Sequence, residues 1–424
     1  MLFVVAGALY ARTLGYDYTY LDDKTLIIDQ GAQLCTPSSL GTAFCRTYTA
    51  VTSDTYYRPL VSLSFAVDAQ YSCLRPMGYH LTNTVLHATT STLLFALLCG
   101  LGLGRIPALF GALLFAVHPV HAASVAWIPG RNDILMAASG VGGSILLLRD
   151  AQRPSLAAKT GHLVCLLLAL LSKETAFCLP LIWLILLWAT DPPRPAAKRA
   201  WMWVGWITAL ALAIAARLTV VTLPEGYLLA QLHTVVERWP VVLADLGKLF
   251  LPVKLQVISS PRDLTLWPGI FGVVSFGVGL LLTGIRRRIV VLALAFLLVP
   301  MLMSLPGART VILENRLYLP AVGVAVVAGE AMRTLGSATK GIRWASLAVA
   351  SSMTTGLAIL SVFHTSNYEN RDRFSQAAIL ASPHSSIAAH LRFRRFHSHA
   401  LDGPARREAR SANSSSTQSS QRTP

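Results

Sequence analysis

The sequence predicts an all-α polytopic membrane protein, because it is strongly apolar, its apolar runs recur from end to end, and its loops are basic. Of its 424 residues, 54% are hydrophobic and only 13% are charged, whereas a soluble domain has about 25% charged residues. The recurring apolar runs exclude a single secretory signal followed by a soluble domain. Short polar breaks between the runs favour helical hairpins over a barrel.

The apolar runs predict about eleven transmembrane helices, since a helix needs about 20 mostly apolar residues to cross the hydrocarbon. The first run is short and starts at the initiator methionine, so we expect a few residues of the first helix to precede it. Residues 233–252 carry too many charges for a span and are expected to lie at the membrane surface. The expected spans are residues 1–14, 85–100, 106–120, 134–148, 162–171, 176–189, 201–223, 266–285, 289–305, 317–332 and 344–363.

The chain divides into three expected regions. Residues 1–363 form the transmembrane domain, and residues 16–84 within it form a large polar first loop. Residues 364–400 form a helical segment outside the membrane. Residues 401–424 lack apolar periodicity and are rich in Ser, Gln and Thr, so this tail is predicted to be disordered.

Two short helical features are expected outside the spans. The apolar residues Leu60, Leu63, Phe65 and Val67 leave room for an amphipathic helix that lies along the membrane surface. Residues 374–396 have the size of one degenerate tetratricopeptide unit, a helical hairpin that cannot bury its apolar face alone.

The formal net charge of +16 indicates contact with a membrane and not with nucleic acid. Nucleic-acid readers carry a soluble basic face with stacking aromatic rings, whereas the basic residues here lie between spans and in the tail. The positive-inside rule places the loops with Arg149, Arg194, Arg286 and Arg333 in the cytoplasm, where they contact anionic lipid. The segments expected in the opposite compartment are the first loop, residues 118–133, 173–174, 224–264 and 305–316, and the C-terminal tail.

This orientation bears on location and on the cysteines. We expect an integral protein of the inner or plasma membrane if the source is bacterial, and of the endoplasmic reticulum if it is eukaryotic. Six cysteines are too few for a disulfide scaffold. Cys35 and Cys45 share the first loop, where they either form a bridge or remain free thiols.

Ionisable residues cluster at the ends of spans on the expected non-cytoplasmic side. Asp22 and Asp23 follow the first span directly, and three interpretations remain open for the pair: a solvated loop, two carboxylates that share a divalent cation, or a general base at the membrane surface. Lys173 and Glu174 directly abut apolar runs, where a charge is costly unless it is partnered. These two residues either form a functional site or break two helices while their side chains reach toward water.

Arginines and histidines complete the set of candidates. Arg58 lies beside two tyrosines, and Arg316 lies at the mouth of a span; each offers a planar fork for phosphate or acts as an interfacial anchor. His118 and His121 are three residues apart, a spacing that can face one metal ion or one anion, or serve interfacial hydrogen bonds. His80 and Arg131 also lie on this side.

These stretches resemble the transmembrane and tetratricopeptide-repeat O-mannosyltransferase family and its bacterial relatives, within the GT-C class of membrane glycosyltransferases that use polyprenyl-phosphate sugars. The resemblance covers about residues 9–382, and its motifs occur in the family's order. The stretches that carry it are Leu21-Asp22-Asp23; Tyr57-Arg58-Pro59-Leu60 with Leu63-Ser64-Phe65; Gly78-Tyr79-His80-Leu81 with Asn83 and His87; His118-Pro119-Val120-His121 with Val125-Ala126-Trp127-Ile128 and Gly130-Arg131; Leu171-Ser172-Lys173-Glu174-Thr175; and Arg316-Leu317-Tyr318-Leu319-Pro320.

The resemblance implies a GT-C-like bundle with a carboxylate of the first external loop at its catalytic centre. Asp22 or Asp23 would then deprotonate the acceptor hydroxyl, while Arg58, Lys173 and Arg316 bind the departing lipid phosphate. The implied donor is a polyprenyl-phosphate sugar such as mannose, and the acceptor is a protein, lipid or glycan. The residues that would orient these groups are Glu174, His80, His118, His121 and Arg131.

The cofactor and two other functions remain open from the sequence. A divalent metal is a candidate cofactor, with Asp22 and Asp23 or His118 and His121 as its ligands. The chain departs from the family in reading Glu314-Asn315-Arg316 where the family has Glu-Arg, and in ending after about one degenerate repeat. A multi-span transporter and a non-catalytic GT-C-like scaffold are the alternatives. A transporter would show internally repeated halves and polar groups at mid-membrane, and the sequence has no such symmetry.

Overall fold

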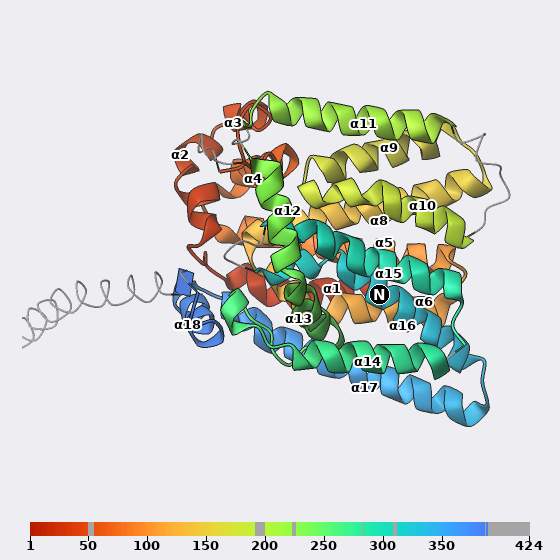
Figure 1. Ribbon diagram of the computed structural model, residues 1–424. Helices are drawn as coiled ribbons and strands as arrows, with labels where there is room; N and C mark the ends of the chain where they lie inside the picture. Colours follow the sequence, from red (N-terminus) through yellow and green to blue (C-terminus); the bar gives the residue numbers. More distant parts are fainter. Residues whose placement is uncertain are drawn as a thin grey trace, which may run out of the picture.

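The computed structural model describes residues 1–49, 55–190, 200–222, 226–282, 284–307, 312–385 and 387–388. Within these ranges the chain is helical, with an isolated β-bridge between Ser259 and Ile312 and no strand. The expected all-α fold is confirmed. Figure 1 shows long helices lying side by side, with short helices gathered at one end of the bundle.

Six segments are long and apolar enough to cross a membrane, or seven if a pair of helices bent by 46° counts as one span. The six are Pro76–Gly100, Ile128–Gln152, Ala200–Leu218, Arg287–Ser304, Glu314–Gly336 and Lys340–Tyr368, and the bent pair is Arg105–Val117 with Pro119–Val125. The other apolar runs form helices of only 10–17 residues, namely Leu2–Gly15, Leu156–Leu170, Glu174–Thr190 and Trp267–Leu281. Each expected run thus contains a helix, but the expected number of about eleven spans is not confirmed, because these four are short for the hydrocarbon.

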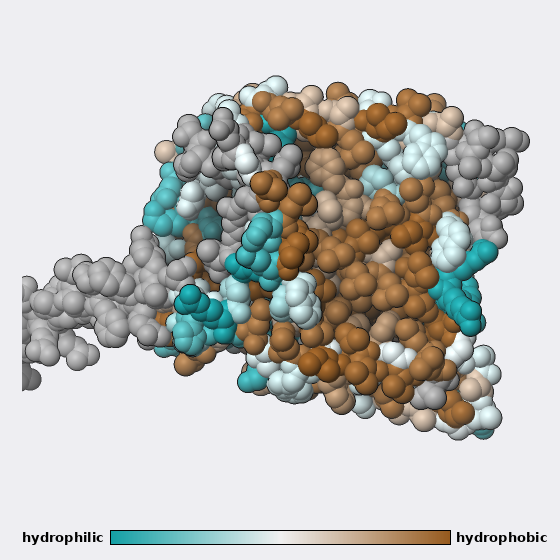
Figure 2. Space-filling model, in the orientation of Figure 1, coloured by the Kyte–Doolittle hydropathy of each residue, from teal (hydrophilic) through white to brown (hydrophobic). Residues whose placement is uncertain are grey.

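The α-helices have the following bounds: α1 Leu2–Tyr10, α2 Gly31–Leu34, α3 Ser38–Thr42, α4 Pro59–Ser72, α5 Pro76–Gly100, α6 Arg105–Val117, α7 Ala122–Val125, α8 Arg131–Gln152, α9 Leu156–Leu170, α10 Leu179–Thr190, α11 Ala200–Leu218, α12 Tyr227–Glu237, α13 Trp239–Phe250, α14 Trp267–Leu282, α15 Arg287–Ser304, α16 Pro320–Gly336, α17 Lys340–Thr365 and α18 Arg371–Ala381. Figure 2 shows an apolar surface over the middle of the bundle, with hydrophilic side chains toward its two ends. This banding is what a bilayer around the middle of the bundle requires.

Small residues let the central helices approach closely. A Cβ atom on Gly111 of α6 would lie 2.5 Å from the carbonyl oxygen of Ala325 in α16. A Cβ atom on Gly323 of α16 would collide with the carbonyl oxygen of Ala293 in α15. Glycine is needed at both positions, because helices in lipid associate through close packing at small residues.

Helix α5 begins at Pro76 and not at residue 85 as the sequence predicts. Its first turns carry polar side chains that hydropathy assigns to a loop, but these side chains are buried and bonded inside the bundle. The Nε of Arg131 donates to the Oδ1 of Asn83 over 2.6 Å, and a ring nitrogen of His87 lies 2.7 Å from the hydroxyl of Tyr318. Because these polar groups are satisfied by tertiary partners, a helix can contain them.

The first loop folds into short helices, and its disulfide joins Cys35 to a cysteine other than Cys45. Cys35, at the end of α2, is bonded to Cys73, at the end of α4. Of the two alternatives for Cys35 and Cys45, the bridge is wrong: Cys45 is an exposed free thiol, whereas Cys35 is bonded to Cys73. The reason is tertiary: α4 is a helix, as expected from its apolar residues, and it returns Cys73 to α2, 38 residues away in sequence.

Short helices also form over residues 233–252 and in the expected C-terminal hairpin. Most of residues 233–252 fall in α12 and α13, two short helices separated at Arg238. The first helix of the expected C-terminal hairpin is α18, while its second helix and the tail over 401–424 lie outside the described residues.

The basic loops share one end of the bundle. The ends of α8 and α16 and the starts of α9, α15 and α17 lie together at the end opposite α2, α3 and α18 (Figure 1). Arg149, Arg286 and Arg333 are at this end, and Arg194 lies outside the described residues. The first loop and the basic loops therefore occupy opposite ends, which is the arrangement that the positive-inside rule requires.

Candidate functional site

Glu174 forms ion pairs with two arginines, at the end of the bundle that carries the first loop. Arg58 is the residue before α4, and its Nη2 lies 2.9 Å from an oxygen of Glu174, with a second bond from Nε at 3.2 Å. The other oxygen of Glu174 accepts from Nη1 of Arg217, near the end of α11, at 3.2 Å. Arg58 and Glu174 were both predicted from the sequence, whereas Arg217 was not.

The neighbouring residue Lys173 forms a buried ion pair with Asp133. Its Nζ lies 2.7 and 2.6 Å from the two carboxylate oxygens. Asp133 lies in the first turn of α8, where the helix dipole favours a negative charge. It also accepts from the side-chain amide of Asn315 at 2.8 Å, which links it to the segment that contains Arg316.

The predicted phosphate ligands lie within electrostatic range of one another. The pKa of Lys173 is lowered to about 8, chiefly by burial, although Asp133 acts in the opposite direction. The positive charges of Arg58 and Arg316 both contribute to this lowering. The structure therefore brings together three cations that are far apart in the sequence.

Aromatic rings connect this cationic cluster to the Asp pair. The Arg58 guanidinium lies over the rings of Tyr48 and Tyr56, at 5.0 and 4.5 Å from their centroids. Burial raises the pKa of Tyr48, and the charges of Arg58 and Asp22 act on it with opposite signs. Arg58 and Asp22 are thus both close to the same tyrosine.

The two adjacent carboxylates have different surroundings. Asp22 is exposed, whereas Asp23 is buried and accepts bonds from the backbone N–H and the hydroxyl of Thr19, at 2.5 and 2.7 Å. Burial raises the pKa of Asp23 to about 6 against these two hydrogen bonds, and the charge of Asp22 raises it further. Tyr20, just before the pair, has a φ of 61°, in the left-handed region that a tyrosine seldom adopts. A strained turn of this kind is often found at a functional site.

Four predicted supporting residues occupy other places. Arg131 is fully buried, pairs with Asp68 at 2.5 Å and bonds the backbone oxygen of Tyr79 at 2.8 Å. It joins α8 to α4 and α5. His80 is buried beside the ring of Tyr16.

The two histidines of the 118–121 turn also lie inside the bundle. A ring nitrogen of His118 lies 3.0 Å from the carbonyl oxygen of Leu249, and His121 packs between the rings of Phe115 and Tyr318. In the part of the chain that the structure describes, no group of three or more His, Cys, Asp or Glu side chains is placed to hold a metal ion.

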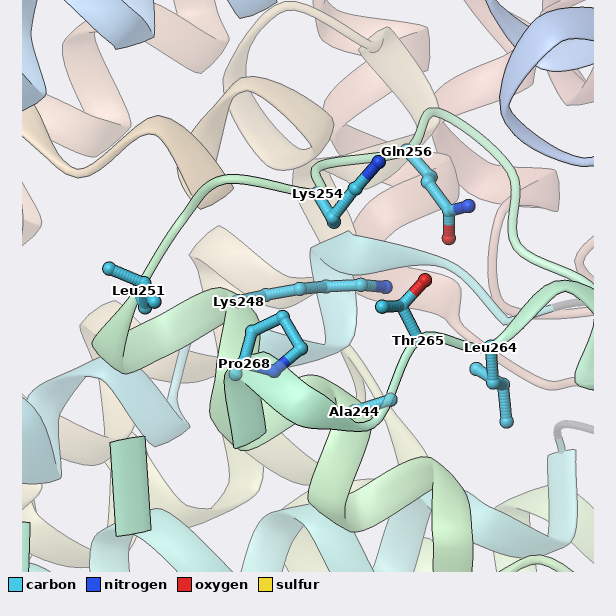
Figure 3. A pocket seen from close by; sticks show the side chains of 9 residues that line it. Ala244, Lys248, Leu251, Lys254, Gln256, Leu264, Thr265 and Pro268 are labelled. Carbon is cyan, nitrogen blue, oxygen red and sulfur yellow. The ribbon is translucent and has the colours of Figure 1, made fainter. Parts of the chain in front are cut away.

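Glu314 belongs to a second buried network. Its carboxylate accepts from the backbone N–H of Gln256 at 2.6 Å and lies 3.6 Å from Nζ of Lys248 and 2.9 Å from His364. Figure 3 shows Lys248 and Gln256 beside a cavity of about 10 Å³, which holds about one water molecule. No sugar fits this space. Asn315 lies between Glu314, which belongs to this network, and Arg316, which belongs to the cationic cluster; Asp245 acts electrostatically on Arg316, so the two groups are neighbours.

Two contributors were missed because their importance depends on tertiary partners. Arg217 had a detectable signal, since it lies inside an expected span and a charge there requires a partner. Asp68 had none, because a single Asp in a polar loop is ordinary. Its burial against Arg131 follows only from the packing of α4 on α8.

The fold and the site together define an all-helical integral membrane protein with a buried cluster of paired charges at the end opposite its basic loops. No family model matches the chain. In comparisons with curated proteins it is 36% identical over 136 residues to mouse (Mus musculus) protein O-mannosyl-transferase TMTC3, covering 31% of this chain and 14% of the relative.

Two further relatives are also protein O-mannosyl-transferases of the TMTC type. The chain is 34% identical over 152 residues to human (Homo sapiens) protein O-mannosyl-transferase TMTC4, covering 31% of this chain and 20% of the relative. It is 32% identical over 186 residues to Drosophila melanogaster protein O-mannosyl-transferase Tmtc1, covering 41% and 20%. The chain is therefore related to the TMTC family, as the resemblance in its motifs predicts, and it spans about a fifth or less of the length of these relatives.

Proposed function

We propose that this chain is a GT-C-type membrane glycosyltransferase that transfers mannose from a polyprenyl-phosphate donor to a hydroxyl group of a protein. The observation that carries the proposal is the charge of the cationic cluster. Among the described residues, Arg58, Lys173, Arg217 and Arg316 share this cluster with the carboxylates of Glu174 and Asp133, and Asp245, which is paired with Lys248, also acts on Arg316. The excess of positive charge in the cluster would stabilise the phosphate, which gains negative charge as it leaves the sugar.

The proposed reaction is a single inverting displacement. Asp22 takes the proton of the acceptor hydroxyl while the hydroxyl oxygen forms a bond to the anomeric carbon. The bond from that carbon to the phosphate oxygen breaks on the opposite face, and polyprenyl phosphate leaves with the electron pair. The base and the cations act at the two ends of an oxocarbenium-like transition state.

Asp22 is the proposed base because it is exposed, so it can meet an acceptor from water. Asp23, buried and held by Thr19, is the proposed positioning group that fixes the turn. Glu174 holds Arg58 and Arg217 in place, while Arg131, His80, His118 and His121 support the surrounding helices.

The proposed site faces the non-cytoplasmic compartment. Two observations support this orientation: the cluster lies at the end opposite the basic loops (Figure 1), and the first loop at the cluster's end of the bundle contains the Cys35 to Cys73 disulfide. Disulfides persist in oxidising compartments and are rare in the cytosol. A reporter fused after Arg288 should score cytoplasmic, whereas one fused after Asp54 or at the C-terminus should score external; a cytoplasmic C-terminus would contradict the orientation.

The test is transfer of labelled mannose from a polyprenyl phosphate to a protein acceptor by purified protein in nanodiscs. We expect Asp22→Asn to reduce turnover by about 100-fold or more, the range for a lost acid-base group, while donor binding persists. The matched control is Asp29→Asn, an exposed carboxylate of the same loop, which should leave turnover unchanged. Wild-type turnover in the double variant Asp22→Asn, Asp23→Asn would show that the base lies elsewhere, whereas no turnover by the wild-type protein would favour a scaffold.

A further inference from the structure

A cavity of about 300 Å³ lies at the other end of the bundle, among the basic loops. It is lined by the C-terminal ends of α5, α8 and α10 and by the start of α15. Leu101, Leu148 and Ile289 form its apolar wall. The volume is at the lower limit of ligand pockets in proteins, which begin at about 300 Å³. The cavity is remote from the proposed transfer site.

Arg286 supplies a guanidinium to this cavity. Its Nε and Nη2 each lie 2.7 Å from an oxygen of Glu330, and Nη2 also donates to the carbonyl oxygen of Leu101 at 3.2 Å. Glu330 is fully buried and accepts at 2.7 Å from Arg333 as well. One carboxylate therefore holds two guanidinium groups, which leaves a positive charge. The Arg286 side chain is 42% exposed.

The surroundings add to this positive charge. Among the described residues at this end of the bundle, basic side chains far outnumber the acidic ones, which are Asp150 and Glu330. The basic residues are Arg105, Arg149, Arg153, Lys159, Arg286, Arg287, Arg288, Arg333, Lys340 and Arg343. The N-terminus of α15 contributes a partial positive charge, whereas the C-terminal ends of α5, α8 and α10 contribute partial negative charges, so the basic side chains decide the sign of the local field. Their excess favours an anion at this place.

The other polar groups of the lining accept or donate hydrogen bonds without a formal charge. Gln152 and Thr190 line the cavity at the ends of α8 and α10, where helices present their last carbonyl oxygens. Such oxygens accept bonds from hydroxyl groups. The apolar side chains Trp188 and Val291, 50% and 41% exposed, lie beside the lining on α10 and α15. They offer a path for an acyl chain.

We propose that this cavity binds the head group of an anionic phospholipid that carries hydroxyl groups. The phosphodiester lies against Arg286, the head-group hydroxyls bond the helix-end carbonyls and Gln152, and the acyl chains run along the outer faces of α10 and α15. Basic pockets between membrane helices suit such lipids. The Arg286 guanidinium attracts the phosphate with its charge and has N–H donors besides the three that bond Glu330 and Leu101, while the apolar wall meets the acyl chain.

The experiment measures lipid retention by native mass spectrometry on delipidated full-length protein. The probes are phosphatidylglycerol, phosphatidylcholine with the same acyl chains, and inorganic phosphate. The variant Gln152→Trp fills the cavity from its exposed rim, and Arg286→Lys keeps the charge but loses the planar guanidinium group and its additional N–H donors. We expect each variant to weaken phosphatidylglycerol binding by about tenfold or more, the loss for one charge-assisted hydrogen bond. The control Thr160→Trp, at an exposed site on α9 at the same end, should change nothing.

Three outcomes would overturn the proposal. They are equal retention of phosphatidylcholine and phosphatidylglycerol by the wild type, unchanged phosphatidylglycerol binding in Gln152→Trp, and competition by inorganic phosphate at the concentration of the lipid. The last would make the site one for free phosphate. Because the measurement is lipid binding and not sugar transfer, its result is independent of the proposed function.

Discussion

The Nζ of Lys173 lies 2.6 Å from a carboxylate oxygen of Asp133, although 40 positions separate the two residues. Both side chains are buried, so neither charge has bulk water as an alternative partner. The pair fixes the turn before α10 to the start of α8. It thereby sets the position of Glu174, the next residue, which holds two arginines of the cationic cluster.

Breaking this pair on one side should be strongly destabilising. We expect Asp133→Asn to lower the free energy of unfolding by about 3–5 kcal/mol, because it leaves an uncompensated buried ammonium group. The double variant Asp133→Asn, Lys173→Met should recover much of the loss. Reversible unfolding in mixed micelles measures both. The control Asp29→Asn breaks an exposed pair with Lys24 and should cost about 1 kcal/mol or less; an equal effect of the two single variants would contradict the prediction.

Donor binding should weaken as the pH rises through about 8. Burial lowers the pKa of Lys173 to about 8, so its ammonium group loses its proton above that pH and its attraction for phosphate with it. Titration of a polyprenyl-phosphate sugar from about pH 7 to about pH 9.5 should show a rising Kd in the wild type. Lys173→Arg, whose guanidinium keeps its proton, should show a flat profile. An identical pH profile in both proteins would exclude Lys173 from the donor site.

The stability of the first loop should fall as the pH rises from about 4 to about 6. Burial raises the folded-state pKa of Asp23 to about 6, above its ordinary value of 3.8. The folded protein therefore holds the Asp23 proton more tightly than the unfolded chain, so the stability that this proton provides is present below about pH 4 and is lost above about pH 6. The difference corresponds to about 3 kcal/mol. We expect Asp23→Asn to unfold at a higher temperature than the wild type at neutral pH, but not at about pH 4. Equal melting of the two proteins at neutral pH would show that Asp23 is not a buried anion.

The disulfide assignment can be tested by peptide mapping without reduction. We expect Cys35 and Cys73 in one linked peptide pair, and Cys45 to be alkylated as a free thiol. Cys73→Ser should release Cys35 for alkylation and lower stability by about 3–4 kcal/mol, the loop-closure value for this separation. Cys45→Ser is the control and should change neither. Recovery of a Cys35 to Cys45 peptide would contradict the structure.

The sequence and the structure agree best where a residue's role depends on local pattern. Apolar runs longer than a helical turn identify each main helix, because lipid requires every backbone group to bond within its own segment. The same logic located Lys173 and Glu174, since charged residues that interrupt apolar runs need partners. Arg58 was predicted from its position beside two tyrosines in the first loop. The family motifs then indicated that these residues act together.

Only the tertiary structure shows which residue each charged side chain pairs with. Hydropathy could not show that Lys173 pairs with Asp133 or that Arg217 forms an ion pair with Glu174. It also could not show that Arg131 is a buried structural residue paired with Asp68. Hydropathy also placed the start of α5 too late, and the sequence left open whether Cys35 is bonded to Cys45, whereas its partner is Cys73. Composition determines that the chain belongs in a bilayer, because transfer from water depends on summed apolar surface. The identity of each charge's partner depends on distances across the bundle, and these exist only after the helices have packed.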